Sequence, residues 1–231
     1  MVKATRVMRL TPELVARVPR FDLDKLPPGP ERPPDSYYEE TARDILAKLA
    51  PGEDLWVFAF GSLLWKPSPE FDGERRPGVV RGWHRAFCLG WDDRFRGNPD
   101  HRGLMLSLDR GGQSRGVALR IRRDDPYANL LLLLKREPPF PLAWVNAVTA
   151  DGPLRAISFA IGRKNKAYVG GLSNEAIADA LALATGEFGS MAEYLHNTVQ
   201  HLEDLGIHDT HLWAMQELVA ERLERLAPVA S

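Results

Sequence analysis

Short apolar runs that end at glycine, proline or charged residues occupy the middle of this 231-residue chain, a pattern typical of β-strands. The run Leu55–Phe60 is apolar throughout, which predicts a strand buried on both faces. Two later pairs of runs are separated by turn sequences, Gly111-Gly112 in one and Asp151-Gly152 in the other, and each pair predicts a hairpin. The remaining strands are predicted over 78–89, over 103–108 and 116–121 with 109–114 as their loop, and over 142–149 and 154–160.

Helical signals lie before, between and after these strands. Pro126, which follows two aspartates, begins a predicted helix that runs to about Glu137, and its five leucines Leu130–Leu134 predict burial on every face. Asp35 is predicted to cap a helix over Ser36–Ala50. Near the end of the chain three more helices are predicted from their N-terminal caps, which are Ser173, the Ser190/Glu193 capping box, and Asp209 or Thr210.

The order of these elements predicts the fold class, because hairpins rather than alternating strand–helix units favour an antiparallel sheet. We expect an α+β protein with an antiparallel or mixed, barrel-like sheet of about six strands and helices packed outside it. A proline-rich stretch at 27–34 separates the start of the chain from the rest. We therefore expect residues 1–53 to be an N-terminal extension, a Pro-rich linker plus one helix. Residues 54–231 are expected to form a single domain, strand-rich over 54–170 and helical over 171–227.

The composition of the chain argues against several classes of protein. Lys and Arg number 30 against 31 Asp and Glu, a net charge of −1, so the chain as a whole is no polyanion binder. Its single cysteine, Cys88, excludes an internal disulfide framework and any site built from several cysteines. No apolar run approaches the ~20 residues of a membrane span, and the first residues lack the apolar core of a secretory signal. We expect a cytoplasmic protein with no membrane partner.

The motifs of covalent, nucleotide-dependent and metal-dependent catalysis are missing, including G-x-S-x-G, G-x-x-x-x-G-K-[ST], G-x-G-x-x-G and H-E-x-x-H. Histidines gather near the end of the chain, but His196 and His201 are five residues apart, which does not place two ligands on one helical face. Cys88 lies in a predicted apolar strand and is expected to be a packing residue. We therefore expect no metal and no cofactor.

Two features remain as candidates for chemistry. The segment Phe60–Trp65 (Phe-Gly-Ser-Leu-Leu-Trp) follows a buried strand, and a turn of this kind can point several backbone N–H groups at one anion. On its spacing alone, an ordinary tight turn is the simpler explanation. Glu137 ends the leucine-rich helix, where burial and the helix dipole would both raise the pKa of its carboxyl group. The alternative is a surface carboxylate paired with Lys135 or Arg136.

Arginines are concentrated between Arg75 and Arg123, a segment with twelve arginines, no lysine and four aspartates. Nucleic-acid binding is one interpretation, because aromatic residues are interleaved with the arginines. Arginines on the solvated face of strands are the simpler interpretation. Binding of a small anionic substrate is a third interpretation, intermediate between these two.

Several separated blocks resemble, in order, the ChaC family of γ-glutamylcyclotransferases. Five blocks carry the resemblance: Trp56–Pro67 (the family's glycine-loop signature), Val80–Arg85, Arg96–Pro99, Arg136-Glu137 (where the family has its catalytic glutamate), and Ser190–Ile207 (its C-terminal helical signature). Together they cover about Leu55 to about Leu226, so the first fifty residues lie outside the resemblance. The chain departs from the family pattern at Ala59 (usually glycine), at Phe60 (usually tyrosine) and in the proline-rich segment after Glu137, which bears on substrate choice.

The resemblance implies an enzyme that cyclises the γ-glutamyl group of glutathione to 5-oxoproline and releases Cys-Gly, without metal or cofactor. It implies that Glu137 is the catalytic general acid and base and that 54–231 is the catalytic domain. The residues implied to contact the substrate are Ala59, Phe60, Gly61, Ser62, Leu63, Leu64 and, with less support, Tyr168.

Two alternatives stay open. One is a cyclotransferase for other γ-glutamyl amines or peptides, and the other is a non-catalytic binding protein that uses the arginine-rich face for an anionic partner. No nucleic-acid partner is expected, and the sequence does not predict the oligomeric state.

Overall fold

The structure, a computed structural model, describes residues 6–226. The chain divides into two compact units. We call the first the barrel unit, which comprises Pro30–Ala86 and Ser107–Lys166, and the second the helical unit, which comprises Met1–Gly29, Phe87–Leu106 and Ala167–Ser231. Each is described by itself below.

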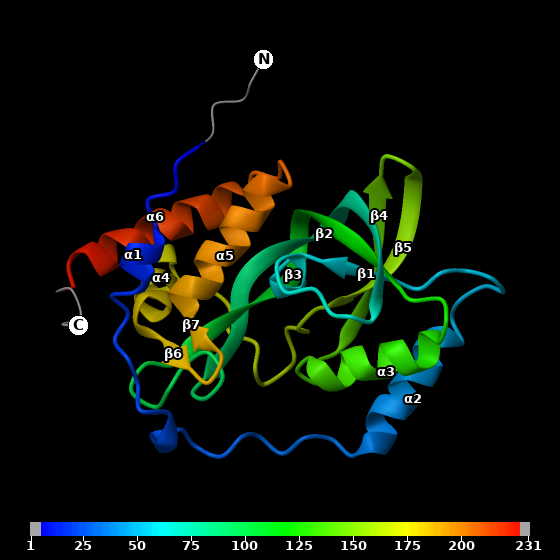
Figure 1. Cartoon of the computed structure of the whole chain (residues 1–231), viewed down its shortest axis with the longest axis horizontal. Helices are drawn as coiled ribbons and strands as arrows, with labels where there is room; N and C mark the ends of the chain where they lie inside the picture. Colours follow the sequence, from blue (N-terminus) through cyan, green and yellow to red (C-terminus); the bar gives the residue numbers. More distant parts are fainter. Residues whose placement is uncertain (1–5, 227–231) are drawn as a thin grey trace. The chain divides into compact units, whose positions relative to one another are not determined.

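The sheet of the structure is a closed barrel of five strands in the order β1-β3-β2-β4-β5 (Figure 1). It is mixed, since β1 pairs antiparallel with β3 but parallel with β5, at Val57 and Ile157. The α+β barrel-like fold is therefore confirmed, with five barrel strands in place of about six. The strands are β1 (Trp56–Ala59), β2 (Phe71–Asp92), β3 (Gly103–Ile121), β4 (Leu142–Thr149) and β5 (Gly152–Phe159).

The difference in strand number comes from 109–114, whose prediction as a hairpin loop is wrong. The segment belongs to the single long strand β3, which passes through the glycine pair. Gly111 and Gly112 have φ of 104° and 62°, values that glycine adopts readily, so the chain bends there without reversing. His84 Nδ1 on β2 lies 3.1 Å from the Gly111 carbonyl oxygen.

The Asp-Gly hairpin is confirmed, because β4 and β5 pair antiparallel along their whole length from Leu142 with Phe159 to Thr149 with Gly152. The continuously apolar run is also confirmed as a strand, and every residue of β1 is buried. Both elements were predictable because their signals are local: a turn that reverses the chain and a run with no polar face.

Two helices of the barrel unit, α2 (Asp35–Leu46) and α3 (Pro126–Arg136), pack against each other (Figure 1). Asp125 caps α3 by accepting from the Ala128 N–H, as its sequence indicates. Two expectations are wrong. Asp35 is the first residue of α2 rather than its cap, and Leu132 is 54% exposed because α3 has one solvent-facing side.

The helical unit contains a short α1 (Pro12–Val15), a 3-10 turn η1 (Leu23–Lys25) and three longer helices. Ser173, Ser190 and Asp209 each accept a backbone N–H at the start of one of these helices, which confirms all three caps. The longer helices are α4 (Asn174–Leu183), α5 (Met191–Asp204) and α6 (Thr210–Glu224), and a two-stranded sheet joins β6 (Thr185–Gly186) to β7 (Gly189–Ser190).

The start of the described chain packs onto the long helices of the helical unit. Leu10 and Leu14 are buried, and α1 contacts both α5 and α6. The Leu10 N–H donates to Gln216 at 2.8 Å, and Arg9 forms a two-pronged ion pair with Glu224. Among the helices of residues 6–226, none is long and apolar enough to span a bilayer.

Candidate active site

The segment that follows β1 forms a tight loop with its apolar side chains turned inward. Gly61, with φ −136° and ψ −130°, leads from the strand into a 3-10 turn, η2 (Ser62–Leu64). The Leu64 N–H bonds to the Gly61 carbonyl at 2.9 Å, so the amides at the start of the turn have no partner within it. Leu63 and Leu64 are buried. What this loop presents to a ligand is therefore its backbone and the Ser62 side chain.

Arg85 on β2 holds this loop from within the barrel unit. Its side chain is buried, with 4% of the residue exposed, and its Nε donates to the Phe60 carbonyl at 2.7 Å. Its Nη2 donates to the Arg115 carbonyl on β3. A charge-assisted hydrogen bond in a buried place is a strong constraint, so Arg85 fixes where β1 ends and the loop begins.

Arg85 has no predicted role from the sequence, although a signal for one is present in β2. Trp83, Arg85 and Phe87 alternate along β2 and all three are buried, so Arg85 points to the same side as two large aromatic residues. A charged side chain in that register needs buried partners.

Gly116 on β3 lies directly against the end of β1. A Cβ at this position would meet the Ala59 carbonyl oxygen and, at 2.8 Å, the ring of Phe58. On the other side, Ser158 Oγ donates to the Phe58 carbonyl at 2.9 Å. The approach to the loop is thus held closely from two neighbouring strands.

Glu137 follows α3 as its C-terminal cap, and its N–H bonds to the Leu133 carbonyl at 3.1 Å. The side chain is mostly buried, with 17% exposed. Burial raises the pKa of this carboxyl group, while the charge of Arg136 acts in the opposite direction. A carboxyl group with a raised pKa holds a proton more readily than an exposed carboxylate, which suits a group that must accept a proton and return it.

Arg136 connects Glu137 to the loop. Its Nη2 donates to the Lys66 carbonyl at 2.9 Å, two residues after η2, and its Nε lies 3.7 Å from Glu137 Oε1. The alternative of a carboxylate paired with Arg136 is thus partly realised, but on a side chain that is mostly buried.

Tyr168 belongs to the helical unit, where it lies beside the end of β2. It forms an isolated bridge with Leu89, and the Val169 N–H donates to the Cys88 carbonyl at 2.8 Å. A Cβ at Gly170 would meet the Tyr168 ring, so glycine is required next to it. Its contact with a substrate stays a prediction.

The segment Arg96–Pro99 organises a loop of the helical unit. The buried Asn98 donates through Nδ2 to the Thr185 carbonyl at 2.8 Å, and its Oδ1 accepts the N–H groups of Asp100 and His101. Burial lowers the pKa of Arg96. This block is a structural clamp between the loop and β6.

A model of the family described as ChaC-like protein matches residues 55–222. The chain belongs to this family. The match begins one residue before β1 and ends within α6. The barrel, the glycine loop, Arg136-Glu137, α4, α5 and most of α6 of this ChaC-like protein therefore fall inside it. The whole segment expected to be an N-terminal extension, 1–53, precedes the match, and it includes α1 and α2.

The relatives of this ChaC-like protein carry a consistent name. It is 36% identical over 181 residues to the "Glutathione-specific gamma-glutamylcyclotransferase" of Escherichia coli (strain K12), covering 75% of this chain and 78% of that protein. It is 29% identical over 210 residues to "Glutathione-specific gamma-glutamylcyclotransferase 1" of Homo sapiens, covering 87% and 94%. A crystal structure of the glutathione-specific cyclotransferase from yeast superposes with a TM-score of 0.66 at 22% identity, over 73% of this chain and 96% of that one, which shows the shared fold.

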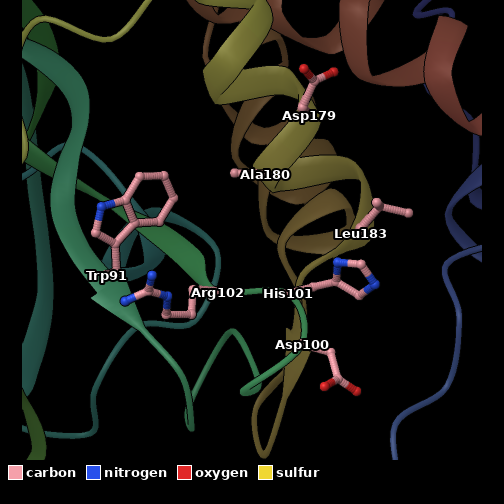
Figure 2. A pocket seen from close by; sticks show the side chains of 7 residues that line it. All are labelled: Trp91, Asp100, His101, Arg102, Asp179, Ala180 and Leu183. Atoms are coloured by element: carbon pink, nitrogen blue, oxygen red, sulfur yellow. The ribbon is translucent and has the colours of Figure 1, made fainter.

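A pocket of about 250 Å³ lies in the helical unit, and its lining includes none of the predicted site residues (Figure 2). The Arg102 guanidinium stacks over the exposed Trp91 ring at 5.9 Å, while Asp100 and Asp179 point away from that ring. Asp179 forms an ion pair with Arg222. The lining side chains therefore do not converge on one ligand position.

The arginine-rich segment is extensively paired in the barrel unit. Arg120 forms ion pairs with Asp54 and Asp72, and Arg123 pairs with Asp54. Others stack on tryptophan rings, as Arg110 does over Trp83 at 3.8 Å. Much of the positive charge is thus neutralised or covered locally, which favours a structural role for this face.

Proposed function

We propose that this chain is a γ-glutamylcyclotransferase that converts glutathione to 5-oxoproline and Cys-Gly, with Glu137 as general base and general acid. The observation that carries the proposal is the state of Glu137. It is a mostly buried carboxyl group with a raised pKa, and Arg136 links it to the glycine loop. The names of the relatives support glutathione as the substrate.

The reaction needs no nucleophile from the protein. The α-amine of the γ-glutamyl residue attacks its own γ-carbonyl carbon, a five-membered lactam forms, and the bond to the cysteine nitrogen breaks. The attacking ammonium loses two protons to become the lactam N–H, and the departing nitrogen gains two to leave as the ammonium group of Cys-Gly, so no net proton is released. A single carboxylate that takes up a proton and returns it can carry these transfers. Holding the substrate folded for this attack supplies a large part of the rate, since well-oriented intramolecular reactions gain up to ~7–11 kcal/mol.

The glycine loop has the chemistry to hold the substrate's anionic part. In this proposal the N–H groups of Gly61, Ser62 and Leu63 and the Ser62 hydroxyl bind the α-carboxylate or the developing oxyanion. Ala59 and Phe60 line the approach and Leu64 anchors the turn. Tyr168 is the further residue proposed to contact the glutamyl group.

The location and the exact γ-glutamyl substrate belong to the proposal as well. A cytoplasmic location is proposed because the single cysteine, Cys88, allows no internal disulfide. The main alternative within the reaction is another γ-glutamyl amine or peptide, since Phe60 replaces the tyrosine that is usual in the family. The extensive pairing of the arginines gives no support to a binding protein for polyanions.

The test is direct measurement of 5-oxoproline after incubation of the purified protein with glutathione. Glu137→Gln keeps the shape of the side chain and removes the base, so turnover should fall by about 100-fold or more while glutathione binding, measured by calorimetry, is largely kept. Glu70→Gln is the matched control, because Glu70 is also a buried glutamate of the barrel unit. Full turnover in Glu137→Gln would refute the mechanism. If 5-oxoproline forms from other γ-glutamyl compounds but not from glutathione, one of those compounds is the substrate in place of glutathione.

A further inference from the structure

The segment of the barrel unit that precedes the family match contacts the end of α3. In this segment, Arg32 precedes α2 and its Nη2 donates to the Lys135 carbonyl oxygen. One turn further, Asp35 Oδ1 lies 3.0 Å from Lys135 Nζ. Both contacts therefore converge on one residue, two positions before Glu137.

The Arg32 contact acts on a backbone group that the helix cannot satisfy by itself. The last four carbonyl groups of an α-helix have no intrahelical partner, and the C-terminal end of the helix dipole attracts positive charge. Arg32 supplies both a donor and a positive charge at this end. Asp35, free from a capping role in α2, holds the Lys135 side chain.

Two further hydrogen bonds hold this turn, in addition to the burial of Leu133 and Leu134. The Glu137 N–H is bonded to Leu133, and Arg136 is bonded to the Lys66 carbonyl. After Glu137 the chain continues with Pro138 and Pro139, which have no N–H groups to donate. The position of the Glu137 carboxyl group therefore depends on how well the last turn of α3 is held.

We propose that Arg32 and Asp35 are positioning residues for Glu137: from outside the family match, they fix the last turn of α3 and thereby aim its carboxyl group. The inference rests on the proposed function, in which Glu137 moves the protons. It assigns a role in the reaction to a segment that the family resemblance does not cover.

The buried face of α2 supports this arrangement. Tyr38, Ala42 and Ile45 are buried, and α2 packs on α3. The Arg32 guanidinium lies 6.0 Å from the centroid of the Tyr38 ring, and at the other end Arg43 lies 5.8 Å from the ring of Tyr127. Arg43 thus contacts the beginning of α3, whereas Arg32 contacts its end.

This geometry provides a matched pair of variants, Arg32→Met and Arg43→Met. Each removes one exposed arginine of the same segment that stacks on a tyrosine, but only Arg32 touches the turn before Glu137. We expect kcat for glutathione to fall by about 3- to 10-fold in Arg32→Met with KM little changed, because misplacement of a catalytic group affects the chemical step. Asp35→Asn should show a smaller fall, and Arg32→Lys should restore much of the rate. Arg43→Met should retain the wild-type kcat.

Hydrogen–deuterium exchange provides a readout that does not depend on activity. The peptide that includes the Glu137 amide should exchange about 2- to 5-fold faster in Arg32→Met than in the wild type or in Arg43→Met. Unchanged exchange in Arg32→Met would overturn the inference, and so would faster exchange with an unchanged kcat in an active enzyme. If the wild type makes no 5-oxoproline, the proposed function fails, while the exchange comparison still decides whether Arg32 holds the turn.

Discussion

The charge of Arg136 should set the pH range in which Glu137 works. Arg136 Nε lies 3.7 Å from Glu137 Oε1, and the arginine side chain is 31% exposed. At this distance the attraction is about 1 kcal/mol in a medium like bulk water and about 4 kcal/mol at an effective dielectric constant near 20. Because Arg136 is partly solvated, we take the lower part of this range, which corresponds to about one pH unit.

The sign of the effect follows from which form the charge stabilises. Arg136 favours the ionised carboxylate and so lowers the pKa of Glu137, against the larger effect of burial, which raises it. The base form of Glu137 is needed to take up the ammonium proton, so activity rises with pH as Glu137 ionises. Removing the charge in Arg136→Met should therefore move the rising limb of the kcat profile to higher pH by about one unit.

The assay is 5-oxoproline formation at saturating glutathione between about pH 4 and pH 9. Arg136→Lys is the control, because lysine keeps the positive charge but loses the planar fork that reaches the Lys66 carbonyl. We expect Arg136→Lys to lose rate at every pH without moving the limb. A limb at the same pH in Arg136→Met and wild type would refute the electrostatic argument.

Three further outcomes concern stability. Glu137→Gln should be more stable to urea than the wild type at pH 7 to 8, because burial raises the folded-state pKa of Glu137 and its ionised form destabilises the fold; the gain should vanish below about pH 4, where the group is protonated in both states. Gly116→Ala should lower the free energy of unfolding in urea by about 1–3 kcal/mol and reduce turnover, because the added Cβ would meet Phe58 and the Ala59 carbonyl. Gly162→Ala is the control and should leave stability nearly unchanged, because a Cβ at Gly162 meets open space. Asn98→Ala should cost about 2–4 kcal/mol in the same assay, since it removes three hydrogen bonds of a buried side chain; a loss under 1 kcal/mol would contradict the clamp.

The candidate site was partly accessible from the sequence. The glycine loop and Glu137 could be proposed as site residues because each lies at the end of a recognisable element, a buried strand and a leucine-rich helix. Arg85 and Gly116 were not, because their roles depend on which strands lie beside β1. Strand neighbours are set by pairing between distant parts of the chain, and no local pattern encodes that pairing.

The histidines near the end of the chain illustrate the same distinction. Spacing alone argued against a metal site at His196 and His201. The structure gives each ring a backbone partner: His196 Nδ1 lies 2.9 Å from the Leu10 carbonyl and His201 Nδ1 lies 2.8 Å from that of Asn197. The partner of His196 comes from the beginning of the chain, which the sequence predicts to be an extension.

The sequence by itself determined the elements whose causes lie within a few residues. Ser173, Ser190 and Asp209 cap helices because a side-chain oxygen reaches an N–H group within the next turn. The Asp151-Gly152 turn joins two strands because it can reverse the chain between them. These interactions depend on neighbouring residues, so they can be predicted before any packing is known.

Tertiary structure decided the features in which a local preference competes with a distant partner. Asp35 has the side chain of a helix cap, but it is the first residue of α2, and its carboxylate pairs with Lys135, one hundred residues away in the chain. The glycine pair Gly111-Gly112 has the sequence of a turn, yet β3 continues through it beside β2. Both outcomes arise because packing of whole elements against each other outweighs the fraction of a kcal/mol to about 1 kcal/mol that a single cap or turn residue contributes.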